Sequence, residues 1–186
     1  AMYNDVIEKM LEFNKSFVEN KTYNHFLTDK FPDKKIAILA CMDTRLTQLL
    51  TAALGLKNGD AKIIKNAGAQ LIGPYDSVMK SLLIAVYELG ATDILVIGHD
   101  DCGVRGLKGE ELIELMKERG ISEEAIEMAG KGCDLKQWLN GFEDIDESVS
   151  SAVRQIKEFP LFPAEIRVYG FVMDPATGAM REAKEV

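Results

Sequence analysis

Residues 92–103, TDILVIGHDDCG, carry the strongest structural signal in this sequence. The apolar run TDILVIG has the length and the β-branched content of a strand buried on both faces, and polar residues and glycine end it abruptly. Residues 35–40 (KIAILA) and 61–64 (AKII) have the same character. Segments with apolar residues at helical spacing, at 47–56 and 76–89, separate the three runs. The predicted order is therefore strand, helix, strand, helix, strand.

This alternation predicts an α/β fold, in which a mostly parallel central sheet is flanked by helices on both faces. A further strand is expected at residues 166–174, and the turn residues PATG at 175–178 fold the chain back into an antiparallel C-terminal edge strand. The remaining apolar periodicity predicts further helices at 110–119, 122–129, 134–140 and 146–159.

The composition is that of one globular domain. A chain of 186 residues that is 47% hydrophobic and 28% charged can bury a core large enough to fold unaided. We expect residues 1–186 to form a single domain that begins with an amphipathic helix at 4–20. No apolar run approaches the roughly 18 residues of a membrane span, and the start of the chain lacks a secretory pattern. We therefore expect a cytoplasmic protein without membrane association.

The charge of the chain argues against nucleic acid as a partner. The formal net charge is −8 at pH 7, and acidic surfaces repel phosphate backbones. The three cysteines cannot all pair with one another. In a reducing compartment, an odd number of cysteines near a histidine indicates metal binding or catalysis before disulfides.

Three side chains that can bind a metal follow two of the predicted strands. Cys41 ends the first strand, and His99 and Cys102 follow the strand that ends at residue 98. Because ligands of parallel sheets bind beyond the carboxyl ends of the strands, topology brings these side chains to one edge. Catalytic zinc takes three protein ligands and keeps a fourth position for water, and thiolate with imidazole suits it. The sequence therefore predicts a zinc site at this edge.

Four segments carry a specific resemblance to a known family. In order and spacing they resemble the signature of the beta-class carbonic anhydrases, and the likeness covers roughly residues 35–178. It is closer to the small prokaryotic subclass of that family. The segments are CMDTR at 41–45, NAGA at 66–69, HDDCG at 99–103 and VYGFVMDPATG at 168–178.

The resemblance implies one Zn²⁺ per chain, bound by Cys41, His99 and Cys102, with Asp43 and Arg45 as an adjoining pair. It implies a zinc lyase, carbonic anhydrase (carbonate dehydratase), in which zinc-bound hydroxide attacks carbon dioxide reversibly to form bicarbonate. Asp43 would orient the hydroxide, and Arg45 would keep Asp43 ionised and away from the fourth zinc position. An Asp43 released from Arg45 could bind zinc itself, so the pair would switch the site between an open and a closed state, and the sequence leaves both states open. Because two thiolates cancel the charge of Zn²⁺, activity is expected to rise toward alkaline pH.

The resemblance also implies an assembly. Members of the family generally build their sites at a dimer interface, where the first helix embraces the partner. The apolar stripe of residues 4–20 suits that role, so we expect a homodimer or a dimer of dimers with this helix as the dimerisation arm. The other partner would be a small-molecule substrate, carbon dioxide or bicarbonate.

Three places depart from the family pattern. Residue 65 is Lys where the family usually has Arg, and the segment at 31–35 lacks the Gln of plant-type members. Asp100 stands where Thr is common in related small forms. Its side chain could cap the following turn or relay protons to buffer.

Three other functions compete with this interpretation. The same fold and zinc site could act on carbon disulfide or carbonyl sulfide. Cys41 could instead be a nucleophile with Arg45 binding phosphate, as in thiol phosphatases, but the short spacing between the two and the unused His99 and Cys102 argue against this. Zinc could also be structural or sensory, with Asp43 as a permanent fourth ligand.

Overall fold

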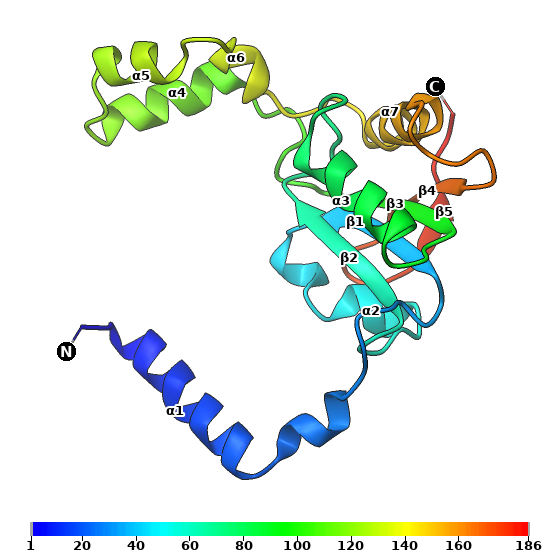
Figure 1. Cartoon of the computed structure of the whole chain (residues 1–186). Coiled ribbons are helices and arrows are strands. Elements are labelled where there is room, and N and C mark those ends of the chain that lie inside the picture. The colour runs from blue at the N-terminus through cyan, green and yellow to red at the C-terminus, as the bar shows by residue number, and fades with distance from the viewer. Residues whose placement is uncertain (1, 186) are drawn as a thin grey trace. The chain divides into compact units, whose positions relative to one another are not determined.

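The chain forms two compact units in the computed structural model, which describes residues 2–185 (Figure 1). The first unit, residues 2–30, consists of helix α1 (Asp5–Glu19) and a short 3-10 helix, η1 (Thr22–Phe26). The second unit, residues 31–185, contains the sheet and the remaining helices. The predicted first helix is thus present, and it belongs to a unit of its own.

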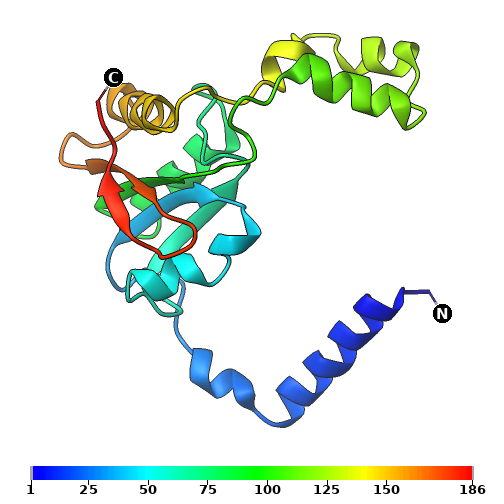
Figure 2. The ribbon, with the colours of Figure 1, turned by 180° about the vertical axis from the view of Figure 1, so that it is seen from behind.

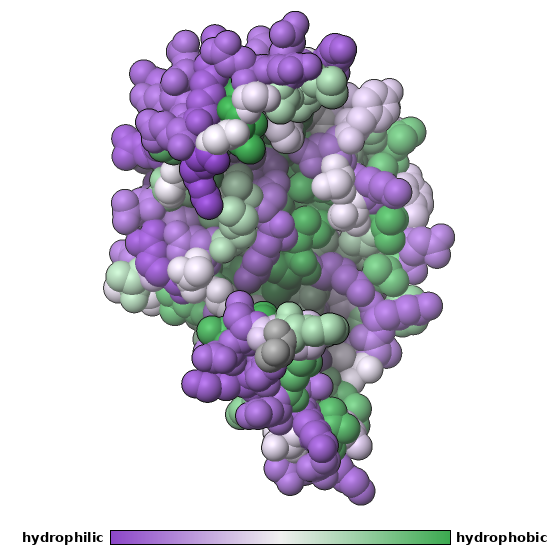
Figure 3. Space-filling model, turned by 90° about the vertical axis from the view of Figure 1, so that its left-hand side faces the viewer, coloured by the Kyte–Doolittle hydropathy of each residue, from purple (hydrophilic) through white to green (hydrophobic). Residues whose placement is uncertain are grey.

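Helix α1 exposes an apolar face. Asn4 caps the first turn, where its side-chain oxygen accepts a hydrogen bond from the Ile7 N–H at 3.0 Å. No residue of α1 is buried, and Figure 3 shows hydrophobic side chains at the surface of the molecule. Such a face marks an interaction surface. Its exposed apolar side chains, between 38% and 73% accessible, are Val6, Ile7, Met10, Leu11, Phe13 and Val18.

One five-stranded sheet, in the order β2-β1-β3-β4-β5, forms the centre of the second unit. The strands from β2 to β4 are parallel, and β5 pairs antiparallel with β4 at the edge (Figure 2). The predicted α/β class, with a mostly parallel sheet and an antiparallel C-terminal edge strand, is confirmed. The strands are β1 (Ile36–Cys41), β2 (Ala61–Asn66), β3 (Asp93–His99), β4 (Arg167–Met173) and β5 (Met180–Glu182).

Helices cover both faces of this sheet, with α3 and α7 on one face and α2 on the other (Figures 1 and 2). Aspartate or serine side chains cap α3, α5, α6 and α7 at their first turns. Within residues 2–185, no helix combines the length and the hydrophobicity that crossing a membrane requires. The helices of this unit are η2 (Thr44–Leu46), α2 (Leu49–Ala53), α3 (Ser77–Tyr87), α4 (Gly109–Glu118), α5 (Glu123–Ala129), α6 (Leu135–Trp138) and α7 (Ile145–Glu158).

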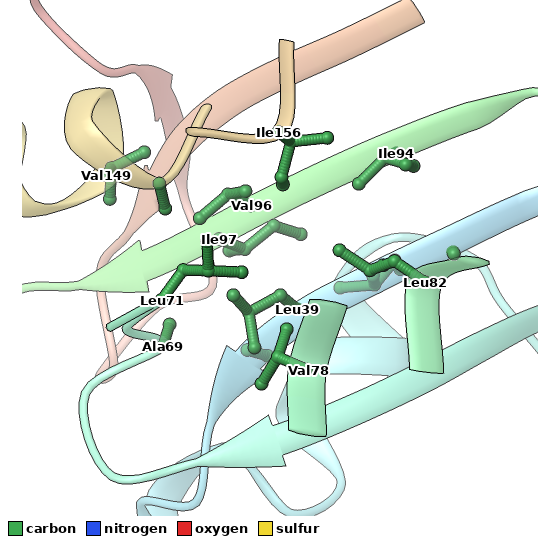
Figure 4. Close-up of a cluster of buried hydrophobic side chains, with 14 of the residues drawn as sticks. Leu39, Ala69, Leu71, Val78, Leu82, Ile94, Val96, Ile97, Val149 and Ile156 are labelled. Carbon is green, nitrogen blue, oxygen red and sulfur yellow. The ribbon is translucent and has the colours of Figure 1, made fainter. Parts of the chain in front are cut away.

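The core fills the space between the sheet and helices α3 and α7 (Figure 4). Leu39 of β1 faces Val78 of α3, and Val96 of β3 lies near Ile156 of α7. All four side chains are at most 2% exposed. Burying a side chain of this size stabilises the fold by about 1.5–3 kcal/mol. The two central strands, β1 and β3, are therefore held firmly in the core.

Two predicted helices are shorter in the structure. The helix expected at 47–56 is shortened to α2, whose first turn has no side-chain cap. The separate turn η2 precedes it, and Asp43 caps that turn by accepting the Arg45 N–H at 2.8 Å. The helix expected at 134–140 is the four-residue α6, and Trp138 in it is 56% exposed. Apolar periodicity alone does not show where such short helices stop.

Gly98 of β3 allows α7 to pack closely on the sheet. A Cβ at this position would lie 2.7 Å from Ile145 Cδ1 and 2.8 Å from Val149 Cγ2. We therefore expect Gly98→Ala to lower the free energy of unfolding by about 1–3 kcal/mol through overpacking, as measured by urea denaturation. Gly103→Ala is the matched control, because a Cβ there meets no atom within 4 Å. Equal losses in the two variants would contradict this packing argument.

Candidate metal centre

The carboxyl ends of β1 and β3 lie side by side. The two strands are parallel neighbours, with Leu39 opposite Val96 and Ala40 opposite Ile97. Cys41 is the last residue of β1, and His99 is the last residue of β3. Both strands therefore deliver a metal-binding side chain to the same edge of the sheet.

A tight turn after β3 brings Cys102 to the other two residues. The Asp100 N–H donates to a carbonyl of β4 at 3.1 Å, and Asp101 adopts a left-handed conformation with φ of 54°. The Sγ atoms of Cys41 and Cys102 lie 4.0 Å apart. The ligand atoms of Cys41, His99 and Cys102 all lie within 4.8 Å of one another. Among the described residues, this is the one group of three or more such side chains close enough to hold a metal.

His99 presents an unpaired ring nitrogen to the two sulfurs. Its Nδ1 lies 2.7 Å from the Asp100 carbonyl oxygen; this oxygen can only accept, so Nδ1 carries the hydrogen and Nε2 keeps a lone pair. His99 is 1% exposed, and in residues 2–185 its Nε2 is the one buried side-chain nitrogen or oxygen without a hydrogen-bond partner. Leaving such an atom unpaired costs about 1–3 kcal/mol. A cation at this position would remove that cost.

The donor set and its spacing fit zinc. Two sulfurs at about 2.3 Å from a tetrahedral zinc ion lie about 3.8 Å apart, close to the 4.0 Å between Cys41 and Cys102. Thiolates disfavour Mg²⁺ and Ca²⁺, because these hard cations prefer oxygen ligands. Three protein ligands leave the fourth tetrahedral position for a small molecule.

The surroundings of Cys41 favour its thiolate. Burial opposes ionisation, but the contacts of its sulfur with His99 and with the Gly68 N–H, which donates at 3.3 Å, outweigh burial and lower the pKa of Cys41 to about 7. The Cys41 sulfur in turn raises the pKa of His99, so a proton or a cation is favoured between these atoms. Burial raises the pKa of Cys102. Cys41 is therefore the readier of the two thiols to release its proton to a metal.

Asp43 and Arg45 form a bidentate ion pair beside these three residues. Arg45 Nε donates to Asp43 Oδ1 at 3.0 Å, and Arg45 Nη2 donates to Asp43 Oδ2 at 2.9 Å. These hydrogen bonds from Arg45 lower the pKa of Asp43 to about 2, and the carboxylate raises the pKa of Arg45. Asp43 Oδ2 lies 3.7 Å from His99 Nε2. An ionised carboxylate therefore borders the candidate metal position.

Two contacts of this site were not predicted from the sequence. Asp101 accepts hydrogen bonds from Arg45 through its carboxylate and through its carbonyl, and the Gly68 N–H reaches a cysteine sulfur. The sequence signal for the first is the acidic pair in HDDC, since aspartate tolerates tight turns. Asp100, for which turn capping and proton relay were both open, has its carboxylate 3.9 Å from Arg181.

A small cavity adjoins the site. It measures about 170 Å³, and its walls include His99, Cys102, Arg105 and Phe142. A larger hollow of about 540 Å³ lies between α7 and strands β4 and β5, and none of the candidate site residues lines it. Of these two spaces, only the smaller one is placed to admit a small molecule to the candidate metal position.

The sequence profile of the carbonic anhydrase family matches residues 36–180. The provisionally named carbonic anhydrase YtiB of Bacillus subtilis (strain 168) is 49% identical, over 94% of this chain and 94% of that protein. The crystal structure of beta-carbonic anhydrase isoform I from Trichomonas vaginalis matches with a TM-score of 0.87 and 33% identity, over 98% of this chain and 99% of that chain. A carbon disulfide hydrolase of Acidithiobacillus thiooxidans is 25% identical, over 80% of this chain and 77% of its own length.

The family match covers the site as well as the fold. Residues 36–180 include the three residues whose ligand atoms converge and the Asp43–Arg45 pair. The similarity to the Trichomonas vaginalis structure extends over nearly the whole of both chains. This chain therefore belongs to the beta-class carbonic anhydrase family of enzymes.

Proposed function

We propose that this protein catalyses the reversible hydration of carbon dioxide to bicarbonate with one zinc ion per chain. The observation that carries the proposal is the meeting of the buried, unpaired His99 Nε2 with two cysteine sulfurs beside an ionised carboxylate. Membership of the carbonic anhydrase family supports the same reaction.

Cys41, His99 and Cys102 would hold the zinc ion. Bound there, zinc supplies Lewis acidity that lowers the pKa of water toward neutrality. The Gly68 N–H on Cys41 and the Nδ1 hydrogen bond of His99 orient two of the ligands. Because the three cysteines are free thiols, a reducing compartment suits the site, and a cytoplasmic location stays a prediction.

Asp43 orients the reacting water. Its Oδ2 lies at the edge of the ligand group, where it can accept a hydrogen bond from a water molecule and turn the lone pair of that water toward carbon dioxide. Arg45 holds both oxygens of Asp43. This pairing keeps the carboxylate ionised and keeps it out of the fourth metal position, so the site stays open to substrate.

Zinc content tests the ligand set. Cys41→Ser should lower the zinc bound per chain at least about tenfold, because loss of a direct ligand costs no less than loss of an outer partner. Cys133→Ser is the matched control, since Cys133 is exposed and lies outside the ligand group. Elemental analysis of protein purified without chelator measures both variants. Full zinc occupancy in Cys41→Ser would show that Cys41 is not a zinc ligand.

Stopped-flow carbon dioxide hydration, from about pH 6.5 to about pH 9, tests the reaction. Turnover should rise toward alkaline pH, because two thiolate ligands cancel the charge of Zn²⁺ and so weaken its effect on the pKa of water. Asp43 does not cause the rise, because its pKa of about 2 leaves it ionised throughout this range. Asp43→Asn should keep zinc and lower turnover on the order of 10²-fold, because the amide orients water poorly. An unchanged rate in this variant would rule out the proposed role of Asp43. Zinc without turnover at any pH would favour a structural or sensory role.

Carbon disulfide is a second candidate substrate. The carbon disulfide hydrolase of Acidithiobacillus thiooxidans is among the relatives of this chain, at 25% identity. The 49% identity to YtiB favours carbon dioxide. Parallel assays on one preparation separate the two, by following bicarbonate formation from carbon dioxide and hydrogen sulfide release from carbon disulfide. Turnover of carbon disulfide alone would reverse the assignment.

We further propose that the protein is a homodimer or a dimer of dimers. The support is the apolar face of α1, on which no residue is buried within the single chain. Covering this face removes apolar surface from water, which contributes roughly 25 cal/mol per Å². A second copy of the chain is the partner that the family relationship favours.

Sedimentation velocity at micromolar concentration checks the assembly. Phe13 is 73% exposed, so Phe13→Glu should shift the protein toward monomer by placing a charge in the apolar contact. Lys9→Gln is the matched control, because it makes the same change in net charge on the same helix and leaves the apolar face intact. A monomeric wild-type protein, or equal shifts in the two variants, would contradict the proposed role of α1.

A further inference from the structure

The guanidinium of Arg45 is held from two sides. Asp43 occupies one side and takes the hydrogen bonds from Nε and Nη2. On the other side, Nη1 donates to Asp101 Oδ2 at 3.1 Å, and Nη2 donates to the Asp101 carbonyl oxygen at 2.8 Å. Four of the five guanidinium N–H groups are therefore used.

The second side comes from the turn between two of the candidate ligands. Asp101 lies between His99 and Cys102 and is 56 residues away from Arg45 in the chain. Its φ of 54° is in the left-handed region, which residues other than glycine rarely adopt. Strained backbone of this kind persists where the surrounding structure holds it and is frequent at functional sites. Here both the carbonyl and the carboxylate of the strained residue contact the same arginine.

We propose that Asp101 is a positioning residue, which anchors Arg45 through Nη1 and Nη2, beside the edge that Asp43 holds, and so keeps Asp43 from entering the fourth metal position. The inference rests on the proposed role of the Asp43–Arg45 pair. Asp43 Oδ2 is 3.7 Å from His99 Nε2, so a small shift of the carboxylate would bring it onto a metal held there. Arg45, when Asp101 anchors it, opposes that shift, because Asp43 could move only by breaking its hydrogen bonds to Arg45 or by pulling Arg45 away from Asp101.

The expected effect is modest. The side chains of Arg45 and Asp101 are 43% and 87% exposed, and solvent weakens ion pairs at such positions. Removing the Asp101 carboxylate should therefore raise the rate at which the hydrogen bonds of the Arg45 guanidinium open by on the order of two- to five-fold. Asn and Gly are suitable replacements, since both tolerate the left-handed backbone and both keep the carbonyl.

Hydrogen exchange of the Arg45 Nε–H in the zinc-loaded protein measures this anchoring without reference to activity. The resonance is identified in nitrogen–proton spectra by its loss in Arg45→Lys. Asp101→Asn and Asp101→Gly should both raise the exchange rate about two- to five-fold. Asp100→Asn removes the same charge from the adjacent residue, whose carboxylate lies near Arg181, and should leave the rate unchanged. Unchanged exchange in both Asp101 variants, or an equal rise in Asp100→Asn, would overturn the proposal.

Cobalt substitution tests the consequence for the metal. The visible spectrum of the cobalt protein reports what occupies the fourth position, and Asp101→Asn should shift it toward carboxylate ligation at neutral pH. The shift should vanish in the double variant Asp43→Asn/Asp101→Asn; a shift that persists there, or no shift in Asp101→Asn, would overturn the proposal. Failure of wild-type protein to hydrate carbon dioxide would overturn the proposed function instead, and both spectroscopic results would still decide the role of Asp101.

Discussion

The parallel pairing of β1 with β3 is the constraint on which the candidate site depends. Backbone hydrogen bonds hold the two strands in one register, with Ala40 opposite Ile97, and the side chains of both strands are buried in the core that α3 and α7 cover. Their carboxyl ends therefore lie at the same edge of the sheet, and the strand pairing alone places Cys41 and His99 close together. The turn that follows His99 needs only two intervening residues, Asp100 and Asp101, to bring Cys102 back to the same point.

The site costs the fold stability when it holds no cation. The buried Nε2 of His99 has no hydrogen-bond partner within residues 2–185, and the nearby sulfurs of Cys41 and Cys102 are buried too. In the part of the chain that the structure describes, the other buried side-chain nitrogens and oxygens all have a hydrogen-bond partner, as is usual in stable proteins. An unpaired lone pair facing two thiols is therefore best understood as a ligand group, whose desolvation is offset when a metal binds.

The neighbours of the three candidate ligands fall into two groups, those that hydrogen-bond a candidate ligand and those that hold the adjacent carboxylate. The Gly68 N–H and the Asp100 carbonyl hydrogen-bond Cys41 and His99 and so orient them. Arg45 instead holds the Asp43 carboxylate next to them, and in the described residues it makes no hydrogen bond to the three candidate ligands. Because Arg45 also contacts the loop that carries two ligands, the position of the carboxylate and the shape of that loop are mechanically linked.

The amino-acid sequence by itself determined the α/β class, the order of the elements and the three converging residues, because strand periodicity, helix periodicity and the carboxyl-edge rule are local or topological. The Asp43–Arg45 pair was also visible, since the two residues are two positions apart. The separation of α1 as its own unit, the exposure of Trp138, the Gly68 N–H on Cys41 and the Asp101 contact with Arg45 were decided only by the tertiary structure. Each of these depends on backbone dihedral angles and on distances between residues remote in the chain, which no spacing pattern in the sequence encodes.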